Sequence, residues 1–257
     1  MQLFDLTDAV AVVTGASGWL GPGMVRALRA AGATVVGVAR RPDALEAALA
    51  DTGASWESAD ITSDDWPLML TRLGEKYGRI DVLVNNAHIG RGGSMNTVDA
   101  EHFDEAWRLS VVSAWQGIQA CRPWMGRARA AGGAPSVINV SSMYGLVGPD
   151  LSLYDAEESR TPPMYGSAKA GLLQLTRYAA AELGPEGIRV NSITPGPFPA
   201  EAARRNQEFV HRLASRTMLG RVGEPDELGT SVLFLASRHS GFVTGSNVVV
   251  DGGWTVR

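Results

Sequence analysis

The hydrophobic positions of the chain follow two alternating patterns, short β-branched runs and longer stretches with helical spacing. The short runs are nearly continuous in apolar residues, as expected of parallel strands buried on both faces of a sheet. They lie at residues 9–14, 33–39, 54–58, 80–85, 135–141, 188–194 and 247–251. The helical patterns between them lie at 20–31, 43–50, 64–77, 100–129, 164–183 and 225–236. This alternation predicts right-handed crossovers and a doubly wound parallel α/β sheet with helices on both faces.

The sequence shows no sign of a boundary between domains. None of its 257 residues belong to an internal repeat or a low-complexity linker, so we expect a single domain over residues 1–257. Hydrophobic residues make up 45% and charged residues 19%, an ordinary globular composition. A net charge of -4 argues against a nucleic-acid partner or an anionic membrane surface.

Compartment and membrane association are addressed by three further observations. Cys121 is the only cysteine, which excludes an intrachain disulfide and is consistent with a reducing cytoplasm. The first ten residues do not have the pattern of a signal peptide, and no apolar stretch approaches the roughly 20 residues that span a bilayer. We therefore expect a cytoplasmic protein that acts on a small molecule, with no metal site.

A glycine-rich turn follows the first predicted strand and precedes a helix. Glycines allow a tight turn and a close approach to a pyrophosphate, whose charge is met by the helix N-terminus. A purely structural turn is the alternative, but the strand–turn–helix context favours a dinucleotide site. The residues that we expect to contact the dinucleotide here are Gly15, Ser17, Gly18, Trp19 and Leu20.

The ends of the next three strands supply further candidate contacts. An acidic residue after the second strand would select NAD, but Arg40 and Arg41 stand there and can instead bind a 2′-phosphate. NADP(H) is therefore the expected cofactor, with Arg40 as the main contact and NAD(H) as the alternative. Other expected contacts are Asp60 and Ile61 after the third strand, where Asp60 could instead cap a helix, and Asn86 and Ala87 after the fourth.

These motifs occur in a recognisable order: Gly15, Gly18 and Gly21, then Asn85-Asn86-Ala87, Tyr165-x-x-x-Lys169, Pro195-Gly196 and the closing Asp251-Gly252-Gly253. In this order and spacing the chain resembles the classical short-chain dehydrogenase/reductase family over nearly its whole length. The resemblance implies a Rossmann-type sheet of seven strands, a nicotinamide cofactor, and a homo-oligomer, either a tetramer or a dimer. It also implies cofactor contacts from Tyr165, Lys169, Pro195, Gly196 and Phe198, with Lys169 at the nicotinamide ribose.

A tyrosine and a lysine one helical turn apart are the candidate acid/base pair. Tyr165 and Lys169 share one face of the predicted helix at 164–183. A nearby ammonium, together with the positive nicotinamide, favours the phenolate and lowers the tyrosine pKa from about 10. By resemblance, Ser142 rather than Ser141 holds the substrate oxygen, because Ser142 lies three residues after Asn139.

The sequence departs from the family pattern at four positions. Trp19 stands where the family has its central glycine, so it is expected to pack or stack over the phosphates. His88 replaces a glycine and is expected to pack without a catalytic role, although it could reach the mouth of the site. Ser110 stands where an asparagine helps to hold the proton-relay water, and is a doubtful relay member. Ala200 replaces a threonine that often contacts the carboxamide.

Two segments are candidates for the substrate side. An insert at about 149–163 lengthens the distance between Ser142 and Tyr165, and we expect it at the rim of the active site or as a solvated excursion. The segment at about 197–220 lies where the family keeps its substrate-covering helices. It contains Arg204, Arg205, His211, Arg212 and Arg216, which could bind a substrate anion or simply face solvent.

The sequence therefore supports one leading function and two alternatives. The leading hypothesis is an NADP(H)-dependent oxidoreductase for a ketone or secondary alcohol. A loose resemblance to gluconate 5-dehydrogenase-like members favours a polar polyol, sugar-acid or cyclic substrate. The alternatives are a 3-oxoacyl carrier-protein reductase, which requires a basic docking patch, and a dinucleotide-binding sensor or scaffold with impaired catalysis.

Overall fold

Seven parallel strands form one sheet, as the sequence predicts. The structure, a computed structural model, describes residues 3–88 and 90–256. The strand order is β3-β2-β1-β4-β5-β6-β7, and every neighbouring pair is parallel. The strands are β1 (Val10–Thr14), β2 (Thr34–Ala39), β3 (Ser55–Ser58), β4 (Val82–Asn85), β5 (Ser136–Val140), β6 (Arg189–Pro195) and β7 (Asn247–Val250).

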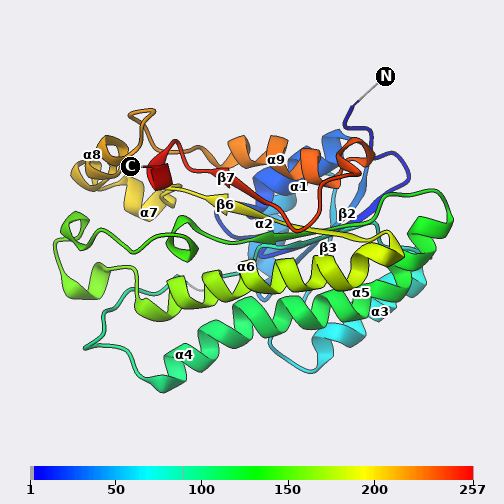
Figure 1. Ribbon diagram of the computed structural model, residues 1–257, viewed down its shortest axis with the longest axis horizontal. Helices are drawn as coiled ribbons and strands as arrows, with labels where there is room; N and C mark the ends of the chain where they lie inside the picture. The colour runs from blue at the N-terminus through cyan, green and yellow to red at the C-terminus, as the bar shows by residue number, and fades with distance from the viewer. Residues whose placement is uncertain (1–2, 89, 257) are drawn as a thin grey trace.

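Helices cover both faces of the sheet, which makes the fold a doubly wound Rossmann-type α/β sandwich (Figure 1). One face carries α1 (Gly21–Ala30), α2 (Pro42–Leu49) and α9 (Leu228–Ala236). The other carries α3 (Asp65–Tyr77), α5 (Ser113–Ala130) and α6 (Pro163–Leu183), with α4 (Ala100–Trp107) packed against α6. Two short helices, α7 (Glu201–Arg204) and α8 (Gln207–Arg216), lie at one end of the sheet together with the insert.

The core is divided between the two faces by the two-residue period of the strands. On β1, Ala11 and Val13 pack in the cluster with α1 and α9, whereas Val12 packs in the cluster with α3 and α5. Both faces of the central strands are buried under helices, which explains why these strands are apolar at nearly every position. The edge strand β3 differs from this expectation, because all four of its residues are exposed. An edge strand has only one neighbour, so its outer surface can stay polar.

The long helix expected at 100–129 is present but not uniform. It consists of α4, a π-helical turn at Arg108–Val112, and α5. A π turn holds one extra residue and leaves helical periodicity intact on either side, so the hydrophobic pattern does not reveal it. In the described part of the chain, no helix is long and apolar enough to cross a membrane.

The strand order reverses between β1 and β4, and this switch point places the functional residues. In open α/β sheets, ligands bind outside the carboxyl ends of the strands where the order reverses. Gly15 follows β1, Arg40 follows β2, Asn86 follows β4 and Ser142 follows β5. Residues that are far apart in the sequence therefore meet at one edge of the sheet.

Candidate active site

A cleft at the switch point collects most of the residues predicted to bind a dinucleotide. One part of it is lined by Gly15, Ser17, Gly18, Trp19, Leu20, Arg40, Arg41, Asp60, Ile61, Asn86 and Ala87. A second part is lined by Tyr165, Lys169, Ser142, Pro195, Gly196, Phe198 and Ala200, and Trp19, Leu20, Asn86 and His88 line both parts. All of the predicted cofactor residues therefore border one continuous site.

The turn after β1 is built around Gly15. Its φ is +64°, and a Cβ at this position would lie 2.8 Å from the Cα of Ala87. Only glycine fits a backbone that is both left-handed and this close to a neighbouring strand. The Asn86 side chain donates to the carbonyl oxygens of Thr14 (3.0 Å) and Gly15 (3.2 Å). Asn86 thus holds the turn from the β4 side.

Trp19 lies where the two parts of the cleft meet. Its indole N–H is buried, and none of the described residues offers it an acceptor. The guanidinium of Arg204 lies 5.5 Å from the centroid of the Trp19 ring. A buried donor without a partner is costly, so a group bound in the cleft that carries acceptor oxygens would satisfy it. The Gly15 turn and this free N–H both fit a dinucleotide.

The end of β2 presents cations to the same cleft. Arg40 and Arg41 are exposed and line the cleft opposite the glycine-rich turn. Asp60 accepts from the backbone N–H and the hydroxyl of Thr62. Burial acts to raise the Asp60 pKa, but these hydrogen bonds and Arg40 outweigh it and the pKa is lowered. Asp60 therefore closes its own turn, and α3 begins after Asp64 with no side-chain cap.

Ser142, Tyr165 and Lys169 converge from two elements. Ser142 ends the segment after β5, and its Oγ accepts from the N–H of Tyr144 at 3.2 Å. Tyr165 lies in the first turn of α6, where its side chain and that of Ser142 line the same cleft. Lys169 lies one turn further on, with Nζ 5.9 Å from the Tyr165 ring centroid and 2.7 Å from the carbonyl oxygen of Val140, to which it donates.

Close packing between α6 and the short helix at Met143–Gly145 brings the serine and the tyrosine together. A Cβ at Gly166 would lie 2.7 Å from the carbonyl oxygen of Tyr144, so only glycine permits this approach. Ser141 donates from Oγ to the carbonyl oxygen of Lys169 at 2.9 Å, which fixes α6 against the end of β5. Ser141 is thus a packing residue, and Ser142 faces the cavity.

Burial dominates the electrostatics of this cluster. It raises the pKa of Tyr165, although the hydrogen bond from Ser142 acts in the opposite direction and repulsion from Tyr154 adds to the increase. Burial also lowers the pKa of Lys169 to about 8. The raised pKa of Tyr165 follows mainly from desolvation, which disfavours the charged phenolate. Lys169 is still mainly protonated at pH 7.

Two residues that depart from the family pattern, His88 and Ser110, lie in different surroundings. His88 lines the dinucleotide cleft, the Tyr165 region and the substrate cavity, and its side chain reaches solvent there. The surrounding protein and, secondarily, the Lys169 ammonium lower its pKa to about 4, so it is neutral at pH 7. Ser110 is buried in the π turn, and it lines none of these three cavities.

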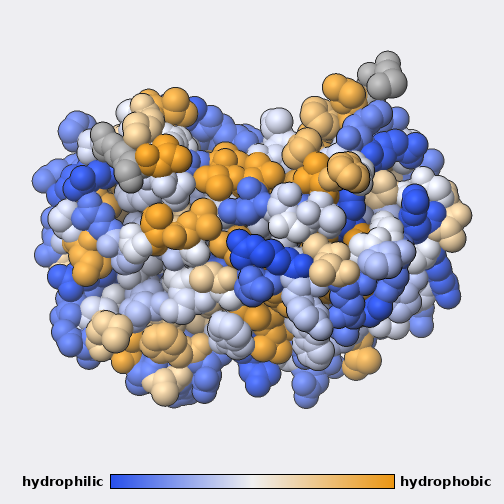
Figure 2. Space-filling view, in the orientation of Figure 1, coloured by the Kyte–Doolittle hydropathy of each residue, from blue (hydrophilic) through white to orange (hydrophobic). Residues whose placement is uncertain are grey.

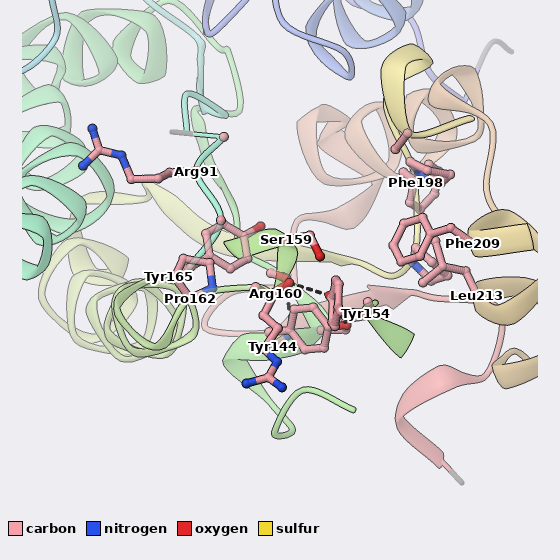
Figure 3. Close-up of a pocket in the computed structure, with 18 of the residues that line it drawn as sticks. Arg91, Tyr144, Tyr154, Ser159, Arg160, Pro162, Tyr165, Phe198, Phe209 and Leu213 are labelled. Carbon is pink, nitrogen blue, oxygen red and sulfur yellow. Dashed lines mark hydrogen bonds between the residues drawn. The ribbon is translucent and has the colours of Figure 1, made fainter. Parts of the chain in front are cut away.

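A cavity of about 360 Å³ opens beside Tyr165 and Ser142 (Figure 3). Phe198, Phe209 and Leu213 form an apolar side, and Tyr165 faces them across the cavity. The insert contributes Tyr154, Ser159, Arg160, Thr161 and Pro162 to the wall. No sequence motif assigns a specific role to Tyr144, Tyr154 or Phe209. The proximity of Tyr144 to Ser142 in the chain is the one signal that pointed to it.

The arginines of the 197–220 segment bind carboxylates of the chain itself. Arg204 pairs with Glu224 at 2.8 Å, and Arg216 pairs with Asp150 at 2.7 Å. Arg212 pairs with Asp155 at 2.7 Å and Glu208 at 3.0 Å, and Arg205 lies 3.7 Å from Glu201. None of these four lines the substrate cavity. The hypothesis that they form a site for a substrate anion is therefore not supported, and their role is to fasten α7 and α8.

The chain is similar to known proteins over most of its length. The family model described as enoyl-(acyl carrier protein) reductase matches residues 15–255. The cis-4-hydroxycyclohexanecarboxylate dehydrogenase of Sinomonas cyclohexanicum is 35% identical over 255 residues, covering 96% of this chain and 97% of that one.

Two solved structures are similar along nearly the whole chain. The RhlG/NADP active-site complex of Pseudomonas aeruginosa has a TM-score of 0.88 and 30% identity, and covers 99% of this chain and 100% of that one. A short-chain dehydrogenase from Leptospira borgpetersenii serovar Hardjo-bovis with bound NAD+ has a TM-score of 0.85 and 28% identity, covering 98% and 94%.

The fold, the cleft and these similarities agree. The chain belongs to the short-chain dehydrogenase/reductase family. It is an oxidoreductase that interconverts CH–OH and C=O groups with a nicotinamide dinucleotide.

Proposed function

We propose that the protein is an NADP(H)-dependent oxidoreductase that interconverts a ketone and a secondary alcohol, with Tyr165 as the acid/base. The observation that carries this proposal is the convergence of Ser142, Tyr165 and Lys169 on one cleft, with Ser142 and Tyr165 also lining the substrate cavity. A phenol and a serine hydroxyl that face one cavity can both contact a single substrate oxygen.

Each residue of the cluster has a distinct task. When bound, the dinucleotide supplies or accepts the hydride. Tyr165 gives its phenolic proton to the carbonyl oxygen in reduction and takes it back in oxidation. Ser142 donates a hydrogen bond to the same oxygen and stabilises the charge that develops there. Lys169, whose Nζ donates to the carbonyl oxygen of Val140, places a positive charge near the phenol, and such a charge favours the phenolate form.

The proposed preference for NADP(H) rests on Arg40 and Arg41. Both are exposed at the end of β2, where a 2′-phosphate would meet guanidinium donors instead of a carboxylate. The remaining cofactor contacts are proposed to come from Gly15, Ser17, Gly18, Trp19, Leu20, Asp60, Ile61, Asn86, Ala87, Pro195, Gly196 and Phe198. Binding of NAD(H) instead remains the alternative.

The substrate is proposed to be a compact, polar or cyclic alcohol or ketone. A cavity of about 360 Å³ with aromatic and hydroxyl-bearing walls suits a ring or short polyol. The Sinomonas relative, which acts on a hydroxylated cyclohexane carboxylate, supports the cyclic option. A carrier-protein thioester is less well supported, since the arginines of α7 and α8 are already paired with Glu224, Asp155 and Asp150.

The chain is proposed to act as a single domain over residues 1–257 and to form a homo-oligomer. Large apolar side chains are exposed on α4, α5 and α9, and Figure 2 shows apolar residues on this face over α9 and β7 and near α4. Exposed apolar surface of this kind is typical of subunit contacts. A mass from light scattering would distinguish a monomer from a dimer or tetramer.

The proposed function is tested by a substrate panel of sugar acids, polyols and cyclic ketones, assayed separately with NADPH and NADH. Consumption of NADPH with at least one ketone, faster than of NADH, is the expected result. Binding of NADPH with no turnover on any member of the panel would instead favour the sensor or scaffold alternative.

A further inference from the structure

Three hydroxyl groups form a hydrogen-bonded row in the wall of the substrate cavity. Oη of Tyr144 lies 3.3 Å from Oη of Tyr154, which lies 2.7 Å from Oγ1 of Thr161. Figure 3 marks hydrogen bonds among these residues with dashed lines. All three line the cavity that also holds Tyr165 and Ser142. We call Tyr144, Tyr154 and Thr161 the hydroxyl triad.

The triad has one hydroxyl proton that its two internal hydrogen bonds do not use. Three hydroxyls carry three protons, and the two internal hydrogen bonds use two of them. The third proton is available to an acceptor in the cavity. Burial raises the pKa of Tyr144, so this phenol keeps its proton throughout the neutral range. The triad is therefore a hydrogen-bond donor that faces the same space as the reacting groups.

Two cations in the same wall each lie near a carboxylate. Arg91 lies 3.4 Å from Glu105, and Arg160 lies 3.7 Å from Glu157, although the buried Nε of Arg160 has no hydrogen-bond partner among the described residues. In Figure 3 the Arg91 side chain extends away from Tyr165. The opposite side of the cavity is apolar. The triad is consequently a neutral donor, placed in the polar wall where it can meet a substrate oxygen other than the one at Tyr165.

We propose that the hydroxyl triad is a specificity subsite that donates a hydrogen bond to a second oxygen of the substrate, away from the carbon that exchanges the hydride. The proposal rests on the proposed function and narrows it to ketones or secondary alcohols with a further hydroxyl or carboxylate group. A site built to bond an oxygen rejects an analogue without it, because the buried hydroxyl is then left unpaired.

The subsite is fixed from two sides. Arg212 on α8 donates to the carbonyl oxygen of Leu153 at 3.0 Å and to the carboxylate of Asp155 at 2.7 Å, the residues on either side of Tyr154. The Tyr154 ring packs 5.7 Å from that of Phe209. Tyr144 is tied to Ser142 through its N–H. The triad is thus held at a defined position relative to the catalytic serine.

The test compares three cyclohexanones substituted at C4 with a carboxylate, a hydroxymethyl or a methyl group, with NADPH as reductant. The variant is Tyr154→Phe, which keeps the ring against Phe209 and removes only the hydroxyl. The matched control is Tyr178→Phe, the same change at a side chain that is 67% exposed on α6. The readout is selectivity, which is the ratio of kcat/KM for each of the two oxygen-bearing ketones to kcat/KM for 4-methylcyclohexanone.

We expect Tyr154→Phe to lower the selectivity for at least one oxygen-bearing ketone by about 10- to 100-fold, the effect of one hydrogen bond to a polar or charged group. The Tyr178→Phe control should keep the wild-type selectivity. The carboxylate and hydroxymethyl arms identify which oxygen the triad prefers. An unchanged selectivity in Tyr154→Phe for both would overturn the proposal.

A binding experiment separates the subsite from the reaction. Cyclohexanecarboxylate has no reducible carbonyl at the ring, and its affinity is measured by calorimetry with and without NADPH. Wild type should bind it at least about five-fold more tightly than Tyr154→Phe. Equal affinities, or no binding to wild type, would count against the subsite. Binding that depends on Tyr154 in a protein that reduces no ketone would refute the proposed function and leave the subsite standing.

Discussion

Arg212 holds the chain on both sides of Tyr154, through the carbonyl oxygen of Leu153 and the carboxylate of Asp155. One guanidinium on α8 therefore fixes the position of an aromatic residue in the insert. This contact joins the two segments that cover the substrate cavity, and neither segment alone would define that wall.

We expect Arg212→Ala to raise KM for a ketone by about three- to ten-fold, since Tyr154 is no longer held over the cavity. KM for NADPH should not change, because Arg212 lies outside the dinucleotide cleft. Steady-state kinetics with each substrate varied in turn measure both quantities. Arg205→Ala is the control, since its ion pair with Glu201 is exposed and long. Equal increases in both KM values would indicate general loosening of the fold.

Tyr165→Phe should reduce kcat by about 10²- to 10⁴-fold, because the variant has no proton to transfer. The affinity for NADPH should remain close to that of wild type, since the ring still packs beside Lys169. Single-turnover kinetics and fluorescence titration with NADPH provide the two measurements. Normal turnover by the phenylalanine variant would show that the proton comes from another group.

Arg40→Ala should lower kcat/KM for NADPH by about 10- to 100-fold through loss of charged hydrogen bonds to the 2′-phosphate. The value for NADH should change little, since NADH lacks that phosphate. Arg177→Ala, a change at an exposed arginine on α6, is the matched control. If the variant lost activity with NADPH and NADH to the same extent, Arg40 would not be a contact of the 2′-phosphate.

Lys169 gives a prediction for pH. Its pKa is about 8 in the folded protein and about 10.5 when solvated, so between these values the unfolded chain binds more protons. The contribution of Lys169 to stability therefore rises with pH from about 8 to 10.5, and the cost of the buried charge is fully present below pH 8. Denaturant titrations should show the difference in unfolding free energy between wild type and Lys169→Met rising by about 2 kcal/mol between pH 8 and pH 10. A difference that stays flat would mean that the ammonium is not desolvated.

Gly166→Ala should destabilise the protein by about 1–3 kcal/mol, because a Cβ here would lie 2.7 Å from the carbonyl oxygen of Tyr144. Ser142 should also move away from Tyr165, so kcat should fall while KM for NADPH is retained. Gly126→Ala is the control, since a Cβ at that helical position meets no atom within 4 Å. It should stabilise the helix by about 0.5–1 kcal/mol. Unfolding curves and kinetics of both variants make the comparison.

The fold could be predicted because its signals are local and repeated. Each central strand is an apolar run, and each is followed along the chain by helical periodicity, so the order of elements fixes the doubly wound sheet. The Gly15 turn and the pair Tyr165 and Lys169 were also predictable, because each is carried by a short local motif, although the contacts of Asn86 and Ala87 with the turn appear only in the fold. The π turn was not, since one extra helical residue leaves the hydrophobic periodicity on either side unchanged. The exposure of β3 is consistent with its sequence, because three of the four residues Ser55–Ser58 are polar.

The substrate wall could not be predicted for a different reason. Tyr144, Tyr154 and Thr161 meet only after the insert has folded back through two 3₁₀ turns onto α8. Charge alone suggested that the arginines on α7 and α8 could bind a substrate anion. Their actual partners, such as Asp155 for Arg212, lie in segments whose relative position the sequence does not specify.

The contact between Lys169 and Val140 has a consequence for how this site can change. The acceptor is a main-chain oxygen at the end of β5, and every amino acid presents that oxygen in the same way. Substitution at position 140 can alter packing, yet it cannot delete the oxygen that accepts the hydrogen bond from Lys169. The position of the acceptor for the ammonium is therefore set by the backbone of β5. A side-chain substitution removes this hydrogen bond directly only at Lys169.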